Sequence, residues 1–209
     1  MKQVLVVEDH AIVRAGIRRL LGERGDIEVF EAATGEAALE EIAARKFALV
    51  ILDLNLPGLA GLELLRRIVR QAPSVPVMIF SQHTEAIYAT RALETGARGF
   101  VSKNATPEEL LAAIETILGG GTAIEKDVAA EMALHDLAED AYLRPLTERD
   151  LEILRLLSAG DSLSEIADKL GIAYKTVANT LSRIKEKLGV GQTSELIRIA
   201  VGRGLADRV

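Results

Sequence analysis

Three carboxylates, a hydroxyl and a lysine follow apolar runs of the sequence, each near the point where a run ends. Glu8 and Asp9 come after the first run and Asp53 after the third, while Ser81 and Lys103 follow the fourth and the fifth. The carboxyl ends of parallel strands lie at one edge of an open sheet, and such sheets bind their ligands at that edge. We therefore expect these five side chains to converge.

Carboxylates that lie this close together repel one another unless a cation lies between them. Mg²⁺ suits such a site, because it prefers oxygen ligands and binds through few carboxylates. A cation and a lysine together can hold a phosphoryl group, since phosphoryl transfer depends mainly on positioning and charge stabilisation. One carboxylate can then act as the nucleophile and form an aspartyl phosphate. Asp53 is the candidate nucleophile, because it ends the middle run and precedes the turn 54–58.

Each of these residue types also has an ordinary structural explanation. An acidic pair after a strand can be a solvated strand end, and an aspartate before a Pro-Gly turn is often a turn residue. The combination of four strand ends, rather than any one residue, favours a site. His83 lies near the site in the sequence and could modulate it, although we expect a surface histidine at a helix start. His10 and His135 are given no role.

The elements that must position these residues alternate between strand-like and helical patterns. Apolar runs separated by amphipathic stretches predict parallel strands joined by helices, and the first, third and fourth runs are apolar enough to be central strands. Thr106 as N-cap and Pro107 at the first helical position mark the clearest helix start. The fold class predicted is α/β, a five-stranded parallel, doubly wound sheet. Its strands are expected at 4–7, 27–30, 48–52, 77–80 and 99–101.

A second, smaller, all-α domain is predicted after the glycines at 119–121. The acidic segment 122–145 is expected to be a linker with room for a short helix. Thr147 and Asp150 mark the start of the first of four short helices, and Ser162 and Glu165 form a capping box for the second. The tight turn at Gly171 then predicts a helix-turn-helix. The predicted domains are therefore 1–121, the linker 122–145 and 146–209.

Composition sets limits on the function. The chain has 209 residues, of which 49% are hydrophobic and 27% charged, so packed cores are expected and disorder is not. The absence of cysteine excludes disulfides and thiolate catalysis and fits a reducing compartment. No apolar run is long enough for a signal peptide or a membrane span, so we expect a cytoplasmic protein without membrane contact. The net charge of −6 means that any DNA contact must come from a local basic surface.

The motifs of residues 1–121 resemble a receiver domain, and the whole chain resembles a NarL/FixJ-type response regulator. The matching pieces are VVEDH at 6–10, LDLNLPG at 52–58, Ser81 and GARGFVSK at 96–103. The resemblance implies that Asp53 is the phosphoacceptor and that Ser81 and Lys103 bind the phosphoryl group. It further implies that Phe100 is an aromatic switch residue. The implied Mg²⁺ ligands are Glu8, Asp9, Asp53 and the main-chain carbonyl of Asn55. Where many receivers have proline, this chain has Asn104.

Residues 146–201 resemble the LuxR-type DNA-binding domain, through LTERD at 146–150, SLSEIA at 162–167, KTVAN at 175–179 and LSRIKEKLG at 181–189. In the third helix of this domain, turning the apolar positions 177, 181, 184 and 188 to the core places Lys175, Asn179, Ser182 and Glu186 opposite. Asparagine can read adenine and lysine can contact guanine or phosphate, and a helix N-terminus favours phosphate. The predicted DNA contacts are Lys175, Thr176, Asn179, Ser182, Arg183, Lys185 and Lys187.

The sequence departs from the LuxR-type pattern at several basic positions. Ala178 and Thr180 stand where lysine and histidine are usual, and Ser164 and Ser182 replace frequently basic residues. Ala173 occupies the usual Ser or Thr cap of the third helix. Fewer phosphate contacts weaken binding and flatten its salt dependence. We therefore predict weak DNA binding that requires a dimer.

The hypothesis is a two-component response regulator. A sensor histidine kinase phosphorylates Asp53, and this switches homodimerisation and binding to promoter half-sites in double-stranded DNA, which regulates transcription. On this hypothesis the chain is no enzyme beyond its own phosphotransfer and dephosphorylation. Two alternatives stay open: a phosphorylation-switched protein-interaction module with weakened DNA binding, and a Mg²⁺-dependent aspartyl-phosphate phosphatase.

Overall fold

The chain divides into two compact units, Met1–Leu134 and His135–Val209. The structure is a computed structural model and describes residues 1–57, 61–134, 142–202 and 205. Gly58 of the LDLNLPG motif and residues 135–141 of the predicted linker lie outside the described residues. Among the described residues, no helix has both the length and the apolar character needed to cross a membrane.

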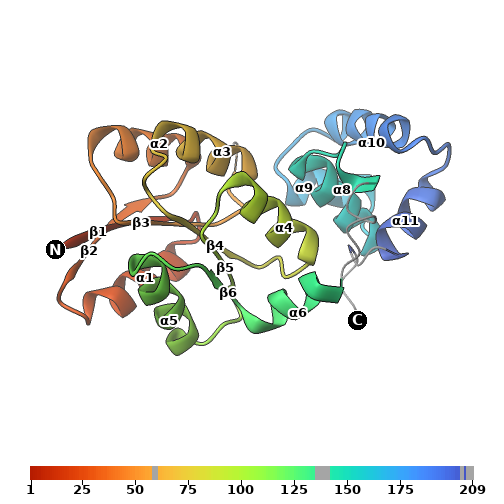
Figure 1. Cartoon of the computed structure of the whole chain (residues 1–209). Coiled ribbons are helices and arrows are strands. Elements are labelled where there is room, and N and C mark those ends of the chain that lie inside the picture. The colour runs from red at the N-terminus through yellow and green to blue at the C-terminus, as the bar shows by residue number, and fades with distance from the viewer. Residues whose placement is uncertain (58–60, 135–141, 203–204, 206–209) are drawn as a thin grey trace. The chain divides into compact units, whose positions relative to one another are not determined.

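The first unit is built on one parallel sheet in the order β2-β1-β3-β4-β5-β6. Helices cover both faces, with α1 and α5 on one side and α2, α3 and α4 on the other (Figure 1). The strands are β1 (Lys2–Val7), β2 (Ile27–Ala32), β3 (Leu49–Leu52), β4 (Val77–Ser81), β5 (Gly99–Ser102) and β6 (Ala123–Ile124). The helices are α1 (Ala11–Gly22), α2 (Gly35–Ala44), α3 (Gly61–Gln71), α4 (Ala86–Thr95), α5 (Pro107–Leu118) and α6 (Lys126–Leu134).

The predicted α/β class and its five strands are confirmed. All residues of β3 and β4 are buried, as are the last four of β1, because these strands lie inside the sheet with helices on both faces. Side chains of β1, β3 and β4 pack with Ile17 and Leu21 of α1 and with Leu110, Ile114 and Ile117 of α5. The predicted cap of α5 is present, since Thr106 Oγ1 accepts the Glu109 N–H in a capping box.

The sheet has a sixth strand that the sequence did not predict. β6 is two residues long and pairs with Gly99 and Phe100 of β5. A Cβ on Gly99 would lie 2.8 Å from the Ala123 carbonyl oxygen, so a glycine is required for this close approach. So short a strand leaves no alternating pattern to recognise. α6 follows it, buries Val128 and packs against α4.

The second unit contains four described helices, α8 (Glu148–Ser158), α9 (Leu163–Lys169), α10 (Tyr174–Leu188) and α11 (Thr193–Gly202). The predicted capping boxes at Thr147 and Ser162 are both formed. Gly171 adopts a left-handed φ of 61° and makes the tight turn between α9 and α10. The predicted all-α helix-turn-helix domain is therefore confirmed.

Candidate functional site

The three predicted carboxylates converge at the carboxyl edge of the sheet. β1 and β3 pair in parallel with Val7 opposite Leu52, so the residues that follow them are neighbours. The Asp53 N–H donates to the Val7 carbonyl oxygen at 2.9 Å, which fixes the start of the loop after β3. Glu8, Asp9 and Asp53 each offer an oxygen within 4.8 Å of the others, and His10 offers a ring nitrogen in the same group.

Lys103 joins this cluster from the end of β5. Its Nζ lies 2.8 Å from Asp53 Oδ2 and 2.7 Å from Glu8 Oε2. Its backbone N–H donates to the Ser81 carbonyl oxygen at 2.8 Å, so the position of the lysine is tied to β4. One cation thus bridges two carboxylates, and both of them are about 1% exposed.

Burial and charge shift the ionisation of this pair. Burial raises the pKa of the Asp53 carboxyl above its ordinary value, although the hydrogen bond from Lys103 opposes the shift. Burial lowers the pKa of the Lys103 ammonium, but its hydrogen bonds to Asp53 and Glu8 more than offset this, and the net pKa is raised. The lysine therefore stays charged, and ionised Asp53 needs the positive charge beside it.

The donor set fits a divalent cation. Glu8, Asp9 and Asp53 carry three negative charges in one cluster, and Lys103 supplies one positive charge. The negative charge of the carboxylates therefore exceeds the positive charge of Lys103, and a metal cation would balance the excess. Carboxylate oxygens are the ligands that Mg²⁺ prefers, and it uses few of them. The residues present thus fit the metal that receiver domains typically use.

Asn55 contacts Asp53, and Ser81 ends β4, the strand that pairs with β3. The Asn55 N–H donates to Asp53 Oδ1 at 3.1 Å, which holds the loop that carries the Asn55 carbonyl. Ser81 is fully buried at the end of β4. Phe100 is also fully buried within β5, so its ring already occupies an inward position. The turn at Asn104 forms without proline, because Ser102 Oγ accepts the Asn104 N–H at 3.0 Å.

Two histidines lie at the site; the sequence interpretation gave His10 no role and preferred a surface position for His83 to a modulating one. His10 Nδ1 lies 3.0 Å from Glu8 Oε1 and 2.9 Å from Asp9 Oδ1. The hydrogen bond that His10 donates to Glu8 and the charge of Asp9 raise the pKa of His10. The expectation of a surface His83 was wrong, because its side chain is buried between the loop after β3 and helix α4. The position of His83 two residues after Ser81 was the feature of the sequence that could have indicated its place at the site.

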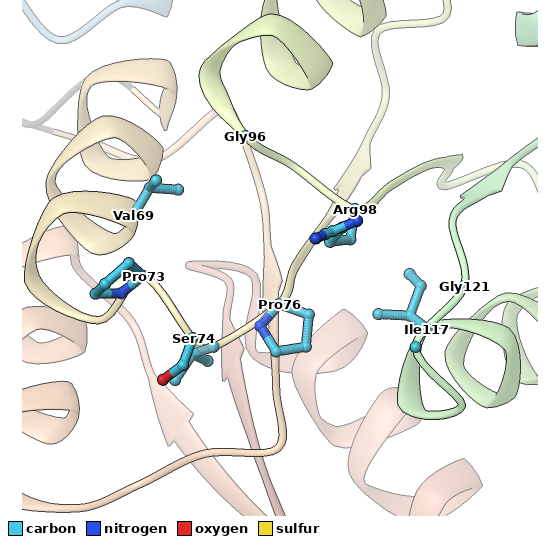
Figure 2. A pocket seen from close by; sticks show the side chains of 10 residues that line it. Val69, Pro73, Ser74, Pro76, Gly96, Arg98, Ile117 and Gly121 are labelled. Atoms are coloured by element: carbon cyan, nitrogen blue, oxygen red, sulfur yellow. The ribbon is translucent and has the colours of Figure 1, made fainter.

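A hollow of about 260 Å³ lies at the other edge of the sheet. Its lining comes from residues that precede β4 and β5 and from the end of α5, and Figure 2 shows Pro76 and Arg98 between Val69 and Ile117. These residues are at the amino ends of the strands, whereas Asp53 follows the carboxyl end of β3. The hollow is therefore separate from the carboxylate cluster.

In the second unit, the predicted orientation of α10 is confirmed. Val177, Leu181, Ile184 and Leu188 are buried. Lys175, Thr176, Asn179, Ser182 and Arg183 are exposed, and Lys185 and Lys187 are half-buried. Ala173 makes no side-chain cap, as its residue type implies. Thr180 is buried, so this position faces the core of the unit rather than solvent.

Two of the predicted DNA contacts have a partner inside the unit. Asp150 of α8 is fully buried, and its carboxylate accepts from Arg183 at 2.9 Å and from Lys187 at 2.6 Å. Burial raises the pKa of Asp150, but hydrogen bonds from Lys187, Thr147 and Arg183 outweigh it and hold the pKa below its ordinary value. These two cations thus neutralise a core carboxylate that links α8 to α10.

Comparison with known proteins assigns a different family pattern to each part of the chain. The family pattern described as the response regulator receiver domain matches residues 4–115, and that of the bacterial regulatory proteins of the luxR family matches residues 144–200. The transcriptional activator protein ExaE of Pseudomonas putida is 38% identical over an alignment of 207 positions, which covers 97% of each chain. The response regulator UvrY of Escherichia coli K12 is 35% identical over an alignment of 211 positions, which covers 99% of this chain and 97% of UvrY.

Solved structures agree with the sequence comparison. RcsB of Salmonella enterica serovar Typhimurium, bound to promoter rprA in the presence of phosphomimetic BeF₃⁻, matches with a TM-score of 0.64 and 25% identity. That match covers 95% of this chain and 97% of RcsB. Both domain patterns are therefore present in one chain, in the order and over the length found in its relatives. The chain belongs to the NarL/FixJ-type response regulators, in which a receiver domain is joined to a LuxR-type helix-turn-helix.

Proposed function

We propose that Asp53 is the phosphoacceptor of this response regulator and that its phosphorylation by a sensor histidine kinase controls dimerisation and DNA binding. The observation that carries the proposal is the contact of Lys103 Nζ with both Asp53 and Glu8 in a buried cluster. A lysine so placed can hold a phosphoryl oxygen as soon as Asp53 is modified. Its charge is needed there, because the modification adds negative charge to a buried carboxylate.

The chain's own residues account for most of the transfer. One Asp53 oxygen attacks phosphorus, and the new O–P bond forms as the P–N bond to the kinase's phosphohistidine breaks. The Asn55 N–H and Lys103 hold the two carboxylate oxygens and so orient the nucleophile. In this proposal Ser81, which ends β4, donates a hydrogen bond to a phosphoryl oxygen. When bound by Glu8, Asp9, Asp53 and the Asn55 carbonyl, Mg²⁺ supplies charge stabilisation to the phosphoryl oxygens.

Acetyl phosphate with Mg²⁺ tests the proposal on the full chain. Intact-mass spectrometry should show the gain of one phosphoryl group, and size-exclusion chromatography with light scattering should show a shift towards dimer. Asp53→Ala should lose both responses, whereas Asp26→Ala, an exposed acidic residue at the other end of the sheet, should keep them. Phosphorylation and dimerisation that persist in Asp53→Ala would contradict the proposal.

The proposed DNA contact is the exposed face of α10. The residues exposed to solvent on this face are Lys175, Thr176, Asn179 and Ser182. The half-buried Lys185 adds positive charge beside them. Arg183 and Lys187 contribute less, because each already pairs with Asp150. DNA contacts with so few cations give a shallow salt dependence. We therefore expect a single domain to bind DNA weakly and a dimer to bind paired half-sites more tightly. We also propose that the protein acts in the cytoplasm.

A further inference from the structure

His83 contacts both loops of the site and the start of helix α4, where its Nδ1 lies 3.6 Å from Glu85 Oε2. Its backbone N–H donates to Ser81 Oγ at 3.1 Å. Its ring Nε2 lies 2.7 Å from the side-chain Oδ1 of Asn55. The ring also stacks on Tyr88, with 4.3 Å between the ring centroids and 20° between the planes. One buried residue therefore touches two loops of the phosphoryl site and helix α4.

The contacts of His83 with Ser81 and with Asn55 would transmit a movement of the phosphoryl site to His83. A hydroxyl has one donor hydrogen and two lone pairs, so Ser81 can donate to a phosphoryl oxygen while it still accepts from His83. A shift of Ser81 Oγ towards the phosphoryl group is then passed to the backbone of His83. Asn55 is held to Asp53 through its N–H, so a change at Asp53 also displaces the side-chain oxygen that contacts the imidazole.

The stack of His83 on Tyr88 carries the displacement into a helix. Tyr88 lies in the first turn of α4 and is about 1% exposed, so its ring has little free space. Close-packed interiors transmit small displacements because they hold few voids. α4 packs against α6, which is the last described helix of the first unit. The path thus ends on the element that leads out of the receiver.

We infer that His83 is a positioning residue that couples the phosphoryl site to helix α4 through its stack on Tyr88. The inference rests on the proposed phosphorylation of Asp53. It assigns to the His83–Tyr88 stack the coupling that the family resemblance gives to Phe100, whose ring is already fully buried.

The test uses the full chain with 3-fluorotyrosine in place of its three tyrosines. Tyr88→Phe assigns the resonance of Tyr88 by its disappearance. Beryllofluoride with Mg²⁺ serves as the phosphoryl probe, and the fluorine signal of protein-bound beryllofluoride reports binding at the site. One ¹⁹F spectrum then reads occupancy of the site and the response of Tyr88 separately.

In the wild type, the Tyr88 resonance should move as beryllofluoride saturates the site. His83→Gln can still bond to Asn55 but has no ring to stack, so it should bind beryllofluoride and lose most of the Tyr88 shift. His83→Phe keeps a ring but not the hydrogen bond to Asn55, so it should keep part of the shift. Gln82→Ala, an exposed neighbour, should behave as the wild type, and circular dichroism checks that each variant is folded.

Two results would overturn the inference alone. The first is beryllofluoride binding to the wild type without any change at Tyr88. The second is a full Tyr88 shift in both folded His83 variants, which would move the coupling to Phe100 or another route. Failure of the wild type to give a bound beryllofluoride signal would instead refute the proposed function, and the inference with it.

Discussion

Asp150→Asn gives the sharpest test of how the recognition helix is held. The buried Asp150 carboxylate accepts from the Thr147 N–H at 2.9 Å, from Arg183 and from Lys187. The amide oxygen of asparagine can still accept from Thr147, so the cap survives. Lys187 Nζ contacts the same oxygen as the Thr147 N–H, so it keeps an acceptor but loses the negative charge. Its side chain is 25% exposed, and a hydrogen bond to a charged group is worth about 1.5–3 kcal/mol. The Arg183 side chain is 54% exposed, so water screens it and its pair adds at most about 1 kcal/mol.

Together these contacts predict a loss of about 1.5–4 kcal/mol in the unfolding free energy of the second unit at neutral pH. For a unit of this size, each kcal/mol lowers Tm by roughly 4–8 °C. Differential scanning calorimetry of the full chain measures this, and the transition of the receiver is identified because Mg²⁺ and beryllofluoride move only that one. Asp168→Asn, an exposed aspartate on α9, is the matched control and should change Tm little.

The pH dependence separates the lost charge from a packing defect. The pKa of Asp150 lies below its ordinary value, so its contribution is complete above the ordinary carboxyl pKa and is lost as pH falls through the lowered pKa. The difference between Asp150→Asn and the wild type should therefore shrink in acid. Two results would contradict this role of Asp150. One is an Asp150→Asn variant as stable as Asp168→Asn at neutral pH. The other is a stability difference between Asp150→Asn and the wild type that stays the same in acid.

Three further predictions concern the metal, the phosphoacceptor and the DNA face. Mg²⁺ at 100 times its Kd should stabilise the receiver by about 2.7 kcal/mol in calorimetry. Asp9→Asn should need a higher Mg²⁺ concentration for the same gain in stability. An equal dependence on Mg²⁺ in the variant and the wild type would exclude Asp9 as a ligand. Burial raises the pKa of Asp53, so ionising it costs stability as pH rises above the ordinary carboxyl pKa. Metal-free Asp53→Asn should accordingly be more stable than the wild type at neutral pH and equal to it in acid, and a less stable variant would contradict this. Ala178→Lys should tighten DNA binding in fluorescence anisotropy and steepen the slope of log K against log salt by about 0.9, whereas an unchanged slope would place residue 178 away from phosphate.

The sequence predicted most of the receiver, because its evidence is strong and local. Continuous apolar runs marked the central strands, and the carboxyl-end rule placed Glu8, Asp53 and Lys103 together before any distance was known. The caps at Thr106, Thr147 and Ser162 were recognisable for the same reason, since each depends on two residues three positions apart.

Features that depend on tertiary contacts were not predictable in this way. β6 has two residues and exists because β5 offers a free edge and a glycine at position 99. His83 is buried because Tyr88 and Asn55, which are far apart in the sequence, close around it. The pairing of Arg183 and Lys187 with Asp150 likewise joins α8 to α10, and the helical periodicity of α10 alone assigned both cations to DNA.

We propose that a phosphoryl group on Asp53 makes this chain bind DNA. Random-site selection with the full chain, with and without beryllofluoride and Mg²⁺, tests this most directly, with Asp53→Ala run in parallel. Paired half-sites should be enriched only with the wild type and only when beryllofluoride is present. Equal enrichment by wild type and Asp53→Ala, or no enrichment of any DNA by the beryllofluoride-bound wild type, would contradict this proposal.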